Sequence, residues 1–284
     1  MSPIAVVTDS TAYLPADVAA DHDLTVVPIT VVIGGREGLE GVDITPVDVA
    51  AALMGRRVSV TTSRPAPADF EATYRRLLDG GASGIVSIHL SSKLSGTYDA
   101  AMLGAAAFGD KVEVVDGRSA GMGLGFAALS GAAAAHAGLD LSGVRDAANS
   151  AVDRTTVLFY VDSLEFLRRG GRIGAAQALL GTALSVKPIL HFLDGGIVVR
   201  DKVRTASRAL AKMVDLAVAA AGDVPVDIAV HHLGTPEKAE QISAALTERL
   251  GDGIKSLYVS EIGAAVAAHV GPGLLSIVVH RRAV

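Results

Sequence analysis

Short apolar segments alternate with helix-like segments along the first half of the chain, and this order constrains the fold more than any other feature of the sequence. The apolar segments are residues 4–8, 26–33, 84–90 and 111–115. Residues 67–78, for example, place Phe70 and Tyr74 on one face at helical spacing. Strands that alternate with helices in this way form parallel sheets. We therefore expect residues 1–153 to form an α/β domain with a parallel, doubly wound sheet.

The pattern changes after about residue 155. Residues 186–193 and 197–203 flank an Asp-Gly-Gly sequence, which indicates a hairpin rather than a crossover connection. The remaining segments predict helices at 206–221 and 236–250 and strands at 226–231, 254–259 and 274–280. We therefore expect residues 154–284 to form an α+β domain with a mixed or antiparallel sheet. Residues 58–80 are candidates to cross over to this second domain.

Composition excludes several classes of protein. The net charge is −5, only 4% of the residues are aromatic, and the sequence contains no long basic run, so a nucleic-acid-binding protein is not expected. There is no cysteine, which excludes disulfides and thiolate catalysis.

One uncharged segment, residues 119–139, has about the length of a membrane span. Gly and Ala dominate it and His136 interrupts it, which favours a buried helix. The amino terminus does not have the pattern of a signal peptide. We expect a cytoplasmic protein without stable membrane insertion.

A hydroxyl-rich stretch, residues 90–101, follows the apolar segment 84–90 and leads into a helical pattern. Its hydroxyl and glycine residues are Ser91, Ser92, Ser95, Gly96 and Thr97. Open α/β sheets bind anionic ligands where a strand ends and a helix begins, because free N–H groups and the helix dipole point there. The alternative is a serine-rich turn that only caps the helix.

The sequence GRSAG around Ser119 matches the G-x-S-x-G pattern of a hydrolase nucleophile. Asp227 with His269, or Asp194 with His232, are the pairs that would complete a catalytic triad. No signature marks either pair, and an upstream oxyanion-loop motif is missing. A serine esterase acting through Ser119 is an alternative function.

Arg168, Arg169 and Arg172 form a basic cluster beside two glycines in an acidic chain. Such a cluster suits a phosphate or an acidic partner, and the alternative is a solvated helix end. The carboxylates near strand ends, such as Asp9, are interpreted as cap residues, so no metal site and no cofactor are expected.

Seven motifs in order resemble those of the DegV family, over nearly the whole chain. They are TDST, TSRPAPADF, LSSKLSGTYDAA, VDGRSAGMGLG, LEFLRRGGRIG, KPIL followed by DGG and K-x-R, and HVGPG. The resemblance implies two α/β domains that enclose a long-chain fatty acid. It also explains GRSAG as a family turn rather than a nucleophile.

The same resemblance implies roles for individual residues. Those expected to bind the fatty acid head group are Thr62, Ser95, Gly96, Arg204 and His269. Arg172, with Arg168 and Arg169, is expected to dock a partner. Two positions depart from the family pattern: Arg64 stands where Gln is common, and VDGRS replaces VDS.

Members of this family are not enzymes, and they present the acyl group to a separate ATP-dependent fatty acid kinase, which forms acyl phosphate. We therefore expect an acyl-chain carrier without catalytic residues or a cofactor, whose partners are a long-chain fatty acid and a fatty acid kinase subunit. Besides the serine esterase, the alternative is a lipid sensor without a kinase partner.

Overall fold

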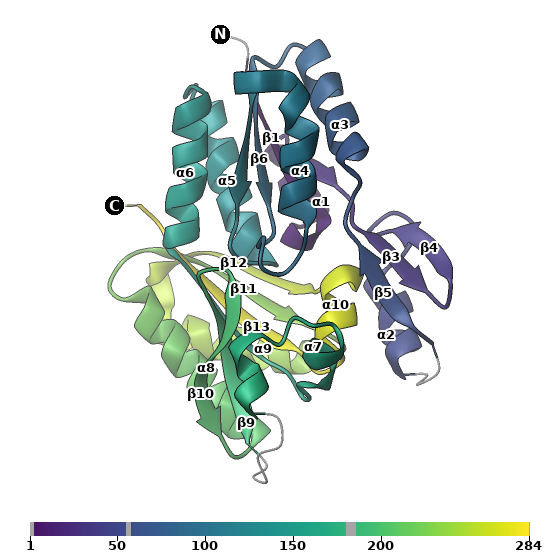
Figure 1. Cartoon of the computed structure of the whole chain (residues 1–284). Coiled ribbons are helices and arrows are strands. Elements are labelled where there is room, and N and C mark those ends of the chain that lie inside the picture. Colours follow the sequence, from purple (N-terminus) through teal and green to yellow (C-terminus); the bar gives the residue numbers. More distant parts are fainter. Residues whose placement is uncertain (1–2, 55–57, 180–185, 284) are drawn as a thin grey trace.

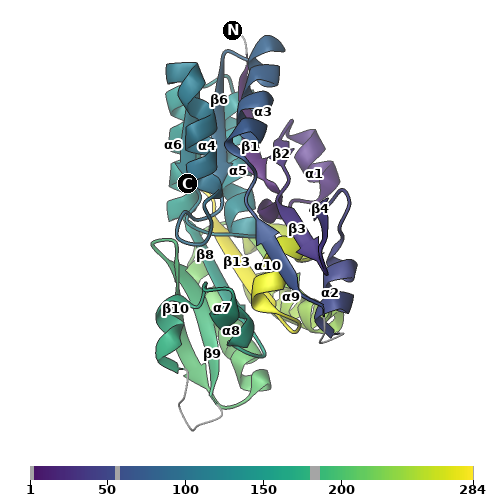
Figure 2. The same cartoon turned by 45° about the vertical axis from the view of Figure 1, so that its right-hand side comes forward.

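The computed structural model describes residues 3–54, 58–179 and 186–283 and is shown from two sides in Figures 1 and 2. Its first sheet is entirely parallel, with the strand order β2-β1-β6-β7. The strands are β1 (Ile4–Asp9), β2 (Thr25–Val27), β6 (Gly84–His89) and β7 (Val112–Asp116).

Helices cover both faces of this sheet (Figure 1). One face packs against α5 (Met122–His136) and α6 (Leu141–Asp153). The other packs against α3 (Pro67–Asp79) and α4 (Thr97–Ala105), while the short α1 (Ala16–Asp21) connects β1 to β2. All six residues of β6 are buried, which explains its almost uninterrupted apolar sequence. The expected doubly wound parallel sheet is confirmed.

The second sheet is mixed and has the strand order β10-β9-β8-β13-β11-β12. Its strands are β8 (Thr155–Tyr160), β9 (Lys187–Leu193), β10 (Gly196–Val203), β11 (Val226–His232), β12 (Ile254–Glu261) and β13 (Leu275–Arg281). Only β11 and β12 pair in parallel. Two helices, α8 (Ala206–Ala221) and α9 (Pro236–Leu250), pack on one face of this sheet. The expected mixed sheet, including the hairpin β9–β10, is confirmed.

A third, antiparallel sheet has the order β4-β3-β5 and lies beside the second domain (Figure 2). Its strands are β3 (Thr30–Ile33), β4 (Arg36–Leu39) and β5 (Val60–Ser63). The prediction of one strand over residues 26–33 is wrong, because the chain leaves the first sheet after Val27 and enters this one at Thr30. Pro28 stands at the break, where it has no N–H for a sheet ladder.

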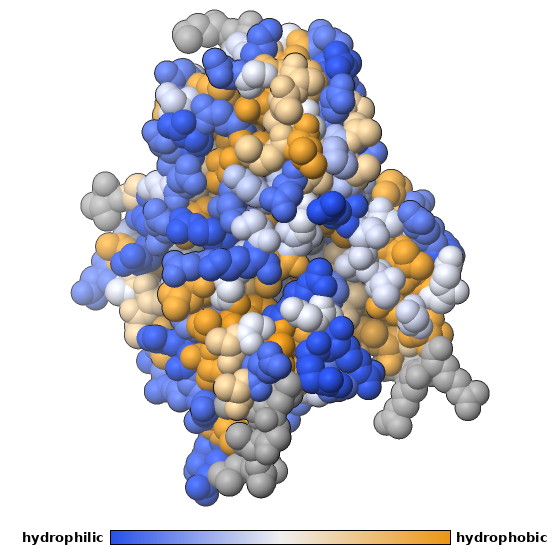
Figure 3. Space-filling model, viewed as in Figure 1, coloured by the Kyte–Doolittle hydropathy of each residue, from blue (hydrophilic) through white to orange (hydrophobic). Residues whose placement is uncertain are grey.

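Two short helices join the third sheet to the second domain. They are α2 (Pro46–Met54) and α10 (Ala264–Val270), which pack against each other, and α10 also contacts β5 and α7 (Glu165–Arg169). Of residues 58–80, β5 therefore lies against α10, whereas α3 returns to the first sheet. Hydrophobic side chains gather on the outer surface of this small sheet region (Figure 3), and Val42 and Val47 are the most exposed of the large hydrophobic residues, at 72% and 68%.

The uncharged segment 119–139 forms α5, which is buried between the first sheet and α6, as expected. Across the described ranges, no helix combines the length and the apolar character needed to cross a bilayer.

Candidate functional site

A cavity lies where the carboxyl ends of the first sheet meet the second sheet and α10. Its empty volume, including the part open to solvent, is about 890 Å³. Most of its wall is apolar. The apolar residues include Ile29, Leu90, Leu94, Val157, Phe159, Leu167, Phe192, Ile197, Ile262, Val266, Val270 and Leu274.

Polar side chains from four separate segments line the same cavity. They include Thr62 on β5, Ser95 before α4, Arg172 after α7 and His269 on α10. Thr62 Oγ1 lies 3.0 Å from His269 Nε2. The Arg172 guanidinium donates to the Leu94 carbonyl oxygen at 2.9 Å, beside Ser95. The structure therefore brings Thr62, Ser95 and His269, the three hydroxyl and imidazole groups expected at the head group, to one cavity.

The arginine that lines the cavity is not the one expected at the head group. Arg204 is exposed, follows the end of the edge strand β10, and is not among the residues that line the cavity. The structure therefore places Arg204 outside the lining of the cavity, and its role at the head group stays a prediction. Arg172, which the sequence assigned to partner docking, supplies a cation to the cavity instead.

His269 is a neutral base in this environment. Burial, reinforced by the positive charge of Arg172, lowers the pKa of His269 to about 4. A carboxylate placed beside the ring would act in the opposite direction, because a nearby negative charge favours the protonated form.

Gly96 does not line the cavity, but its lack of a side chain leaves room for Arg64, which does. A methyl group on its α-carbon would overlap the Arg64 guanidinium, which would then have to shift away from this position. Arg64 lines the cavity and is exposed. The departure from the family pattern at this position therefore adds a cation to the rim.

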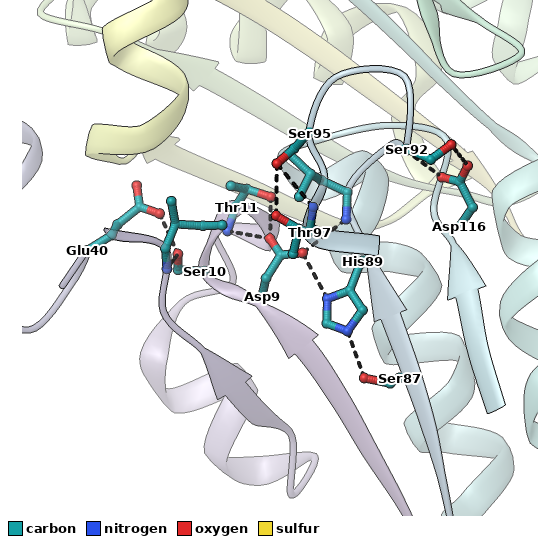
Figure 4. A network of polar contacts seen from close by, with 12 residues as sticks. Asp9, Ser10, Thr11, Glu40, Ser87, His89, Ser92, Ser95, Thr97 and Asp116 are labelled. Carbon is teal, nitrogen blue, oxygen red and sulfur yellow. Dashed lines mark hydrogen bonds and ion pairs between the residues drawn. The ribbon is translucent and has the colours of Figure 1, made fainter. Parts of the chain in front are cut away.

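A buried hydrogen-bond network fixes the floor of the cavity (Figure 4). The Asp9 carboxylate accepts from the backbone N–H groups of Thr11 and Leu90, each at 3.0 Å. Both of these residues line the cavity, so Asp9 ties the ends of β1 and β6 together beneath it.

The network continues away from the cavity. His89 Nδ1 lies 3.0 Å from Asp9 Oδ2, and its Nε2 lies 2.7 Å from Ser87 Oγ, which accepts from the Tyr74 hydroxyl at 2.8 Å. Ser87, His89 and Asp9 have the order of a catalytic triad, but all three are completely buried. A substrate cannot reach this serine, so the network is structural. Sequence reasoning missed it because a serine two residues before a histidine on a strand is a weak signal.

A second buried carboxylate, Glu40, positions α10. It is 5% exposed and accepts from the Ala265 N–H at 2.7 Å and from the Ser10 hydroxyl at 2.5 Å. The Tyr13 hydroxyl, 3.2 Å from Glu40, accepts in turn from the Val266 N–H at 3.0 Å. Burial raises the pKa of Glu40. Since α10 carries His269, Glu40 helps to place that ring, a role that no local sequence signal indicated.

The expected triad of Ser119 with Asp227 and His269 is not assembled. It is 7% exposed, and its hydroxyl donates to the Ala120 carbonyl oxygen at 3.4 Å. The carboxylate of Asp227 is paired with Arg282 at 2.7 Å, and His269 contacts Thr62. Within the described part of the chain, no histidine or carboxylate is hydrogen-bonded to Ser119, and the triad is not assembled.

The three arginines expected to act together are separated. Arg168 and Arg169 are exposed on α7 and both bind Glu165, at 2.6 and 2.7 Å. These hydrogen bonds, that of Arg168 first, lower the pKa of Glu165 to about 2. Gly171, with φ +71°, turns the chain after the helix, and Arg172 lines the cavity.

Comparison with known proteins agrees with this architecture. Residues 3–282 match the family described as "Uncharacterised protein, DegV family". A DegV domain-containing protein of Streptomyces coelicolor is 51% identical over 98% of this chain and 99% of its own length. One of Mycobacterium tuberculosis is 42% identical over 97% of this chain and 96% of its own.

Solved structures of the same family are also similar. A DegV family protein from Thermus thermophilus, described by its fatty acid binding, superposes with a TM-score of 0.92 at 32% identity, covering 99% of this chain and 100% of that one. DegV from Bacillus subtilis, described as a fatty acid binding protein, gives a TM-score of 0.91 at 31% identity over the same shares of the two chains. The chain therefore belongs to the DegV family.

Proposed function

We propose that this protein binds a long-chain fatty acid in the cavity, with the carboxylate held by Thr62, Ser95, Arg172 and His269. The observation that carries the proposal is the composition of the cavity wall: it is largely apolar, and a cation, an imidazole and two hydroxyls line it together. The fatty acid binding described for the relatives from Thermus thermophilus and Bacillus subtilis supports it.

The apolar wall suits the energetics of such a ligand. Burying about 14 methylenes at about 0.8 kcal/mol each gives on the order of 11 kcal/mol of gross stabilisation. A hydrogen bond to a charged group contributes only about 1.5–3 kcal/mol. The tail therefore supplies most of the affinity, and the polar residues set the orientation of the chain.

The polar residues also offset the cost of burying a carboxylate. An ionised group in an apolar cavity is strongly destabilised unless it is paired and hydrogen-bonded. Arg172 supplies the charge and the Thr62 and Ser95 hydroxyls supply donors, while His269 becomes a further donor when the carboxylate raises its pKa.

The acyl group is then presented to a separate, ATP-dependent fatty acid kinase in the cytoplasm. A carboxylate oxygen attacks the γ-phosphorus of ATP, the bond to ADP breaks, and acyl phosphate forms on the bound ligand. No side chain of this protein forms a covalent bond in that step. Arg168 and Arg169 lie on the helix immediately before Arg172, where they suit an acidic surface of the kinase.

Native mass spectrometry of delipidated protein loaded with palmitate tests the binding step. We expect one fatty acid per chain, and we expect Ser95→Ala to lower the affinity about tenfold, because one charge-assisted hydrogen bond is lost. Ser92→Ala is the matched control, since Ser92 lies in the same loop but is exposed and hydrogen-bonded to Asp116. A protein that takes up neither palmitate nor oleate would contradict the proposal. Acyl phosphate formed on adding kinase and ATP distinguishes a carrier from a lipid sensor.

A further inference from the structure

A second cavity lies beside the first, and Val157 and Phe192 line both. The other residues of the second cavity come from the turn between β7 and α5, from the end of α6 and from the hairpin turn between β9 and β10. Charged residues among them include Arg118, Asp153 and Asp194. The apolar cavity and this polar one are therefore neighbours with a shared wall.

The shared wall lies away from the helix that carries His269. Strand pairing sets Val157 opposite Val278, near the start of β8. The helix that carries His269 leads instead into the start of β13, where Leu275 pairs with Tyr160 at the end of β8. Three residues of extended strand, from Val157 to Tyr160, span roughly 10 Å. A fatty acid bound by its head at His269 would therefore direct its methyl end toward the shared wall.

Phe192 packs firmly into this wall. Its half-buried ring lies 5.6 Å, centroid to centroid, from that of Phe159, and it contacts two hydrophobic clusters. The hairpin turn that follows it is anchored to the first domain, because the Ser91 hydroxyl donates to the Gly195 carbonyl oxygen at 2.7 Å.

The second cavity provides little favourable contact for an acyl chain whose methyl end reaches the Phe192 ring. Arg118 and Asp153 form an ion pair at its edge, so a methyl end would meet charged groups there rather than apolar surface. The second cavity can add to the affinity only for an acyl chain that already fills the first cavity up to the Phe192 ring.

We propose that Phe192 ends the acyl cavity and thereby sets the longest chain that the protein accepts. This inference rests on the proposed fatty acid binding. Replacing the ring by a smaller side chain joins the two cavities and admits longer chains, whereas a larger ring shortens the cavity.

The test measures the affinity for saturated fatty acids of increasing length, from laurate to behenate, by displacement of a fluorescent fatty acid. For the natural protein, each added methylene should tighten binding about fourfold until the chain reaches the ring. In Phe192→Ala the affinity should keep rising for at least two further methylenes. Chains of that length should bind the variant about 16-fold more tightly than they bind the natural protein. In Phe192→Trp the limit should move to shorter chains, and this variant decides the question if Phe192→Ala does not fold.

Phe108→Ala is the matched control, because Phe108 is also half-buried but packs against Tyr74 and lines neither cavity. It should keep the natural limit. An unchanged limit in both Phe192 variants, with palmitate still bound, would overturn the inference and leave fatty acid binding intact. Failure of the natural protein to bind any chain of the series would overturn the proposed function and the inference with it.

Discussion

Two histidines line the same cavity, and they differ in what satisfies their ring nitrogens. His231 is 2% exposed, its Nε2 accepts from the Met122 N–H at 2.9 Å, and its Nδ1 lies 3.1 Å from Ser260 Oγ. His269, on α10, contacts the hydroxyl of Thr62 on β5 of the third sheet. Burial, the largest cause in each case, lowers the pKa of both rings to about 4.

The comparison shows that a lowered pKa alone does not identify a ligand-binding histidine. His231 accepts from a backbone N–H that has to be satisfied, so the ring holds β11 against the start of α5. The partner of His269 is a side-chain hydroxyl, which a carboxylate can share or replace. We therefore assign His231 to stability and His269 to binding.

The largest expected effect is the acid sensitivity caused by His231. The ordinary pKa of histidine is near 6.5, so between pH 6.5 and 4 the unfolded chain binds a proton that the folded protein does not. The free energy of unfolding should therefore fall as the pH falls through this range, by about 3 kcal/mol for this ring. Gln can accept from the Met122 N–H without titrating, so His231→Gln should remove that part of the pH dependence.

Urea unfolding of the ligand-free protein at a series of pH values measures this difference. The pKa values of His269 and His280 are also lowered to about 4, so their protonation destabilises the folded protein over the same pH range and keeps part of the slope in the variant. Parallel pH profiles for the natural protein and His231→Gln would refute the assignment of His231 to stability.

The next effect is on binding and concerns His269. His269→Gln should weaken palmitate binding about tenfold, through the loss of one charge-assisted hydrogen bond. His191→Gln is the control, since His191 is also half-buried but does not line the cavity. Titration calorimetry gives the affinity, and undiminished affinity in His269→Gln would remove the ring from the head-group site.

The first sheet and the region around α10 differ in how far the sequence predicted them. The strands and helices of the first sheet follow from buried apolar segments and amphipathic spacing, which act locally. The strand predicted over residues 26–33 failed because Pro28 lets the chain change sheets there, and periodicity does not record which sheet a segment joins. The seven residues of α10 were missed, because a short, Ala-rich segment has no distinctive helical pattern.

The candidate site shows the same limit. The motifs that place Thr62, Ser95 and His269 give each residue's position in the chain but not the direction of its side chain. The motifs therefore did not reveal that Arg172 lines the cavity and that Arg204 does not: the turn at Gly171 directs the chain after α7 to the cavity, and β10 ends at the surface. The partners of Glu40 come from distant parts of the chain, so local patterns do not reveal its role.

The smallest expected effect concerns the support of His269 rather than the ring itself. Glu40→Gln keeps an oxygen for the Ala265 N–H but replaces a charge-assisted hydrogen bond by a neutral one, so stability should fall by about 1 kcal/mol. Palmitate affinity should fall about threefold, because α10 is held less firmly and His269 moves with it. Glu37→Gln, an exposed position on β4 of the same small sheet, is the control and should change neither quantity. If Glu40→Gln lost stability but bound palmitate with full affinity, α10 would be placed by its hydrophobic contacts alone, and Glu40 would stabilise the fold in the way that His231 does.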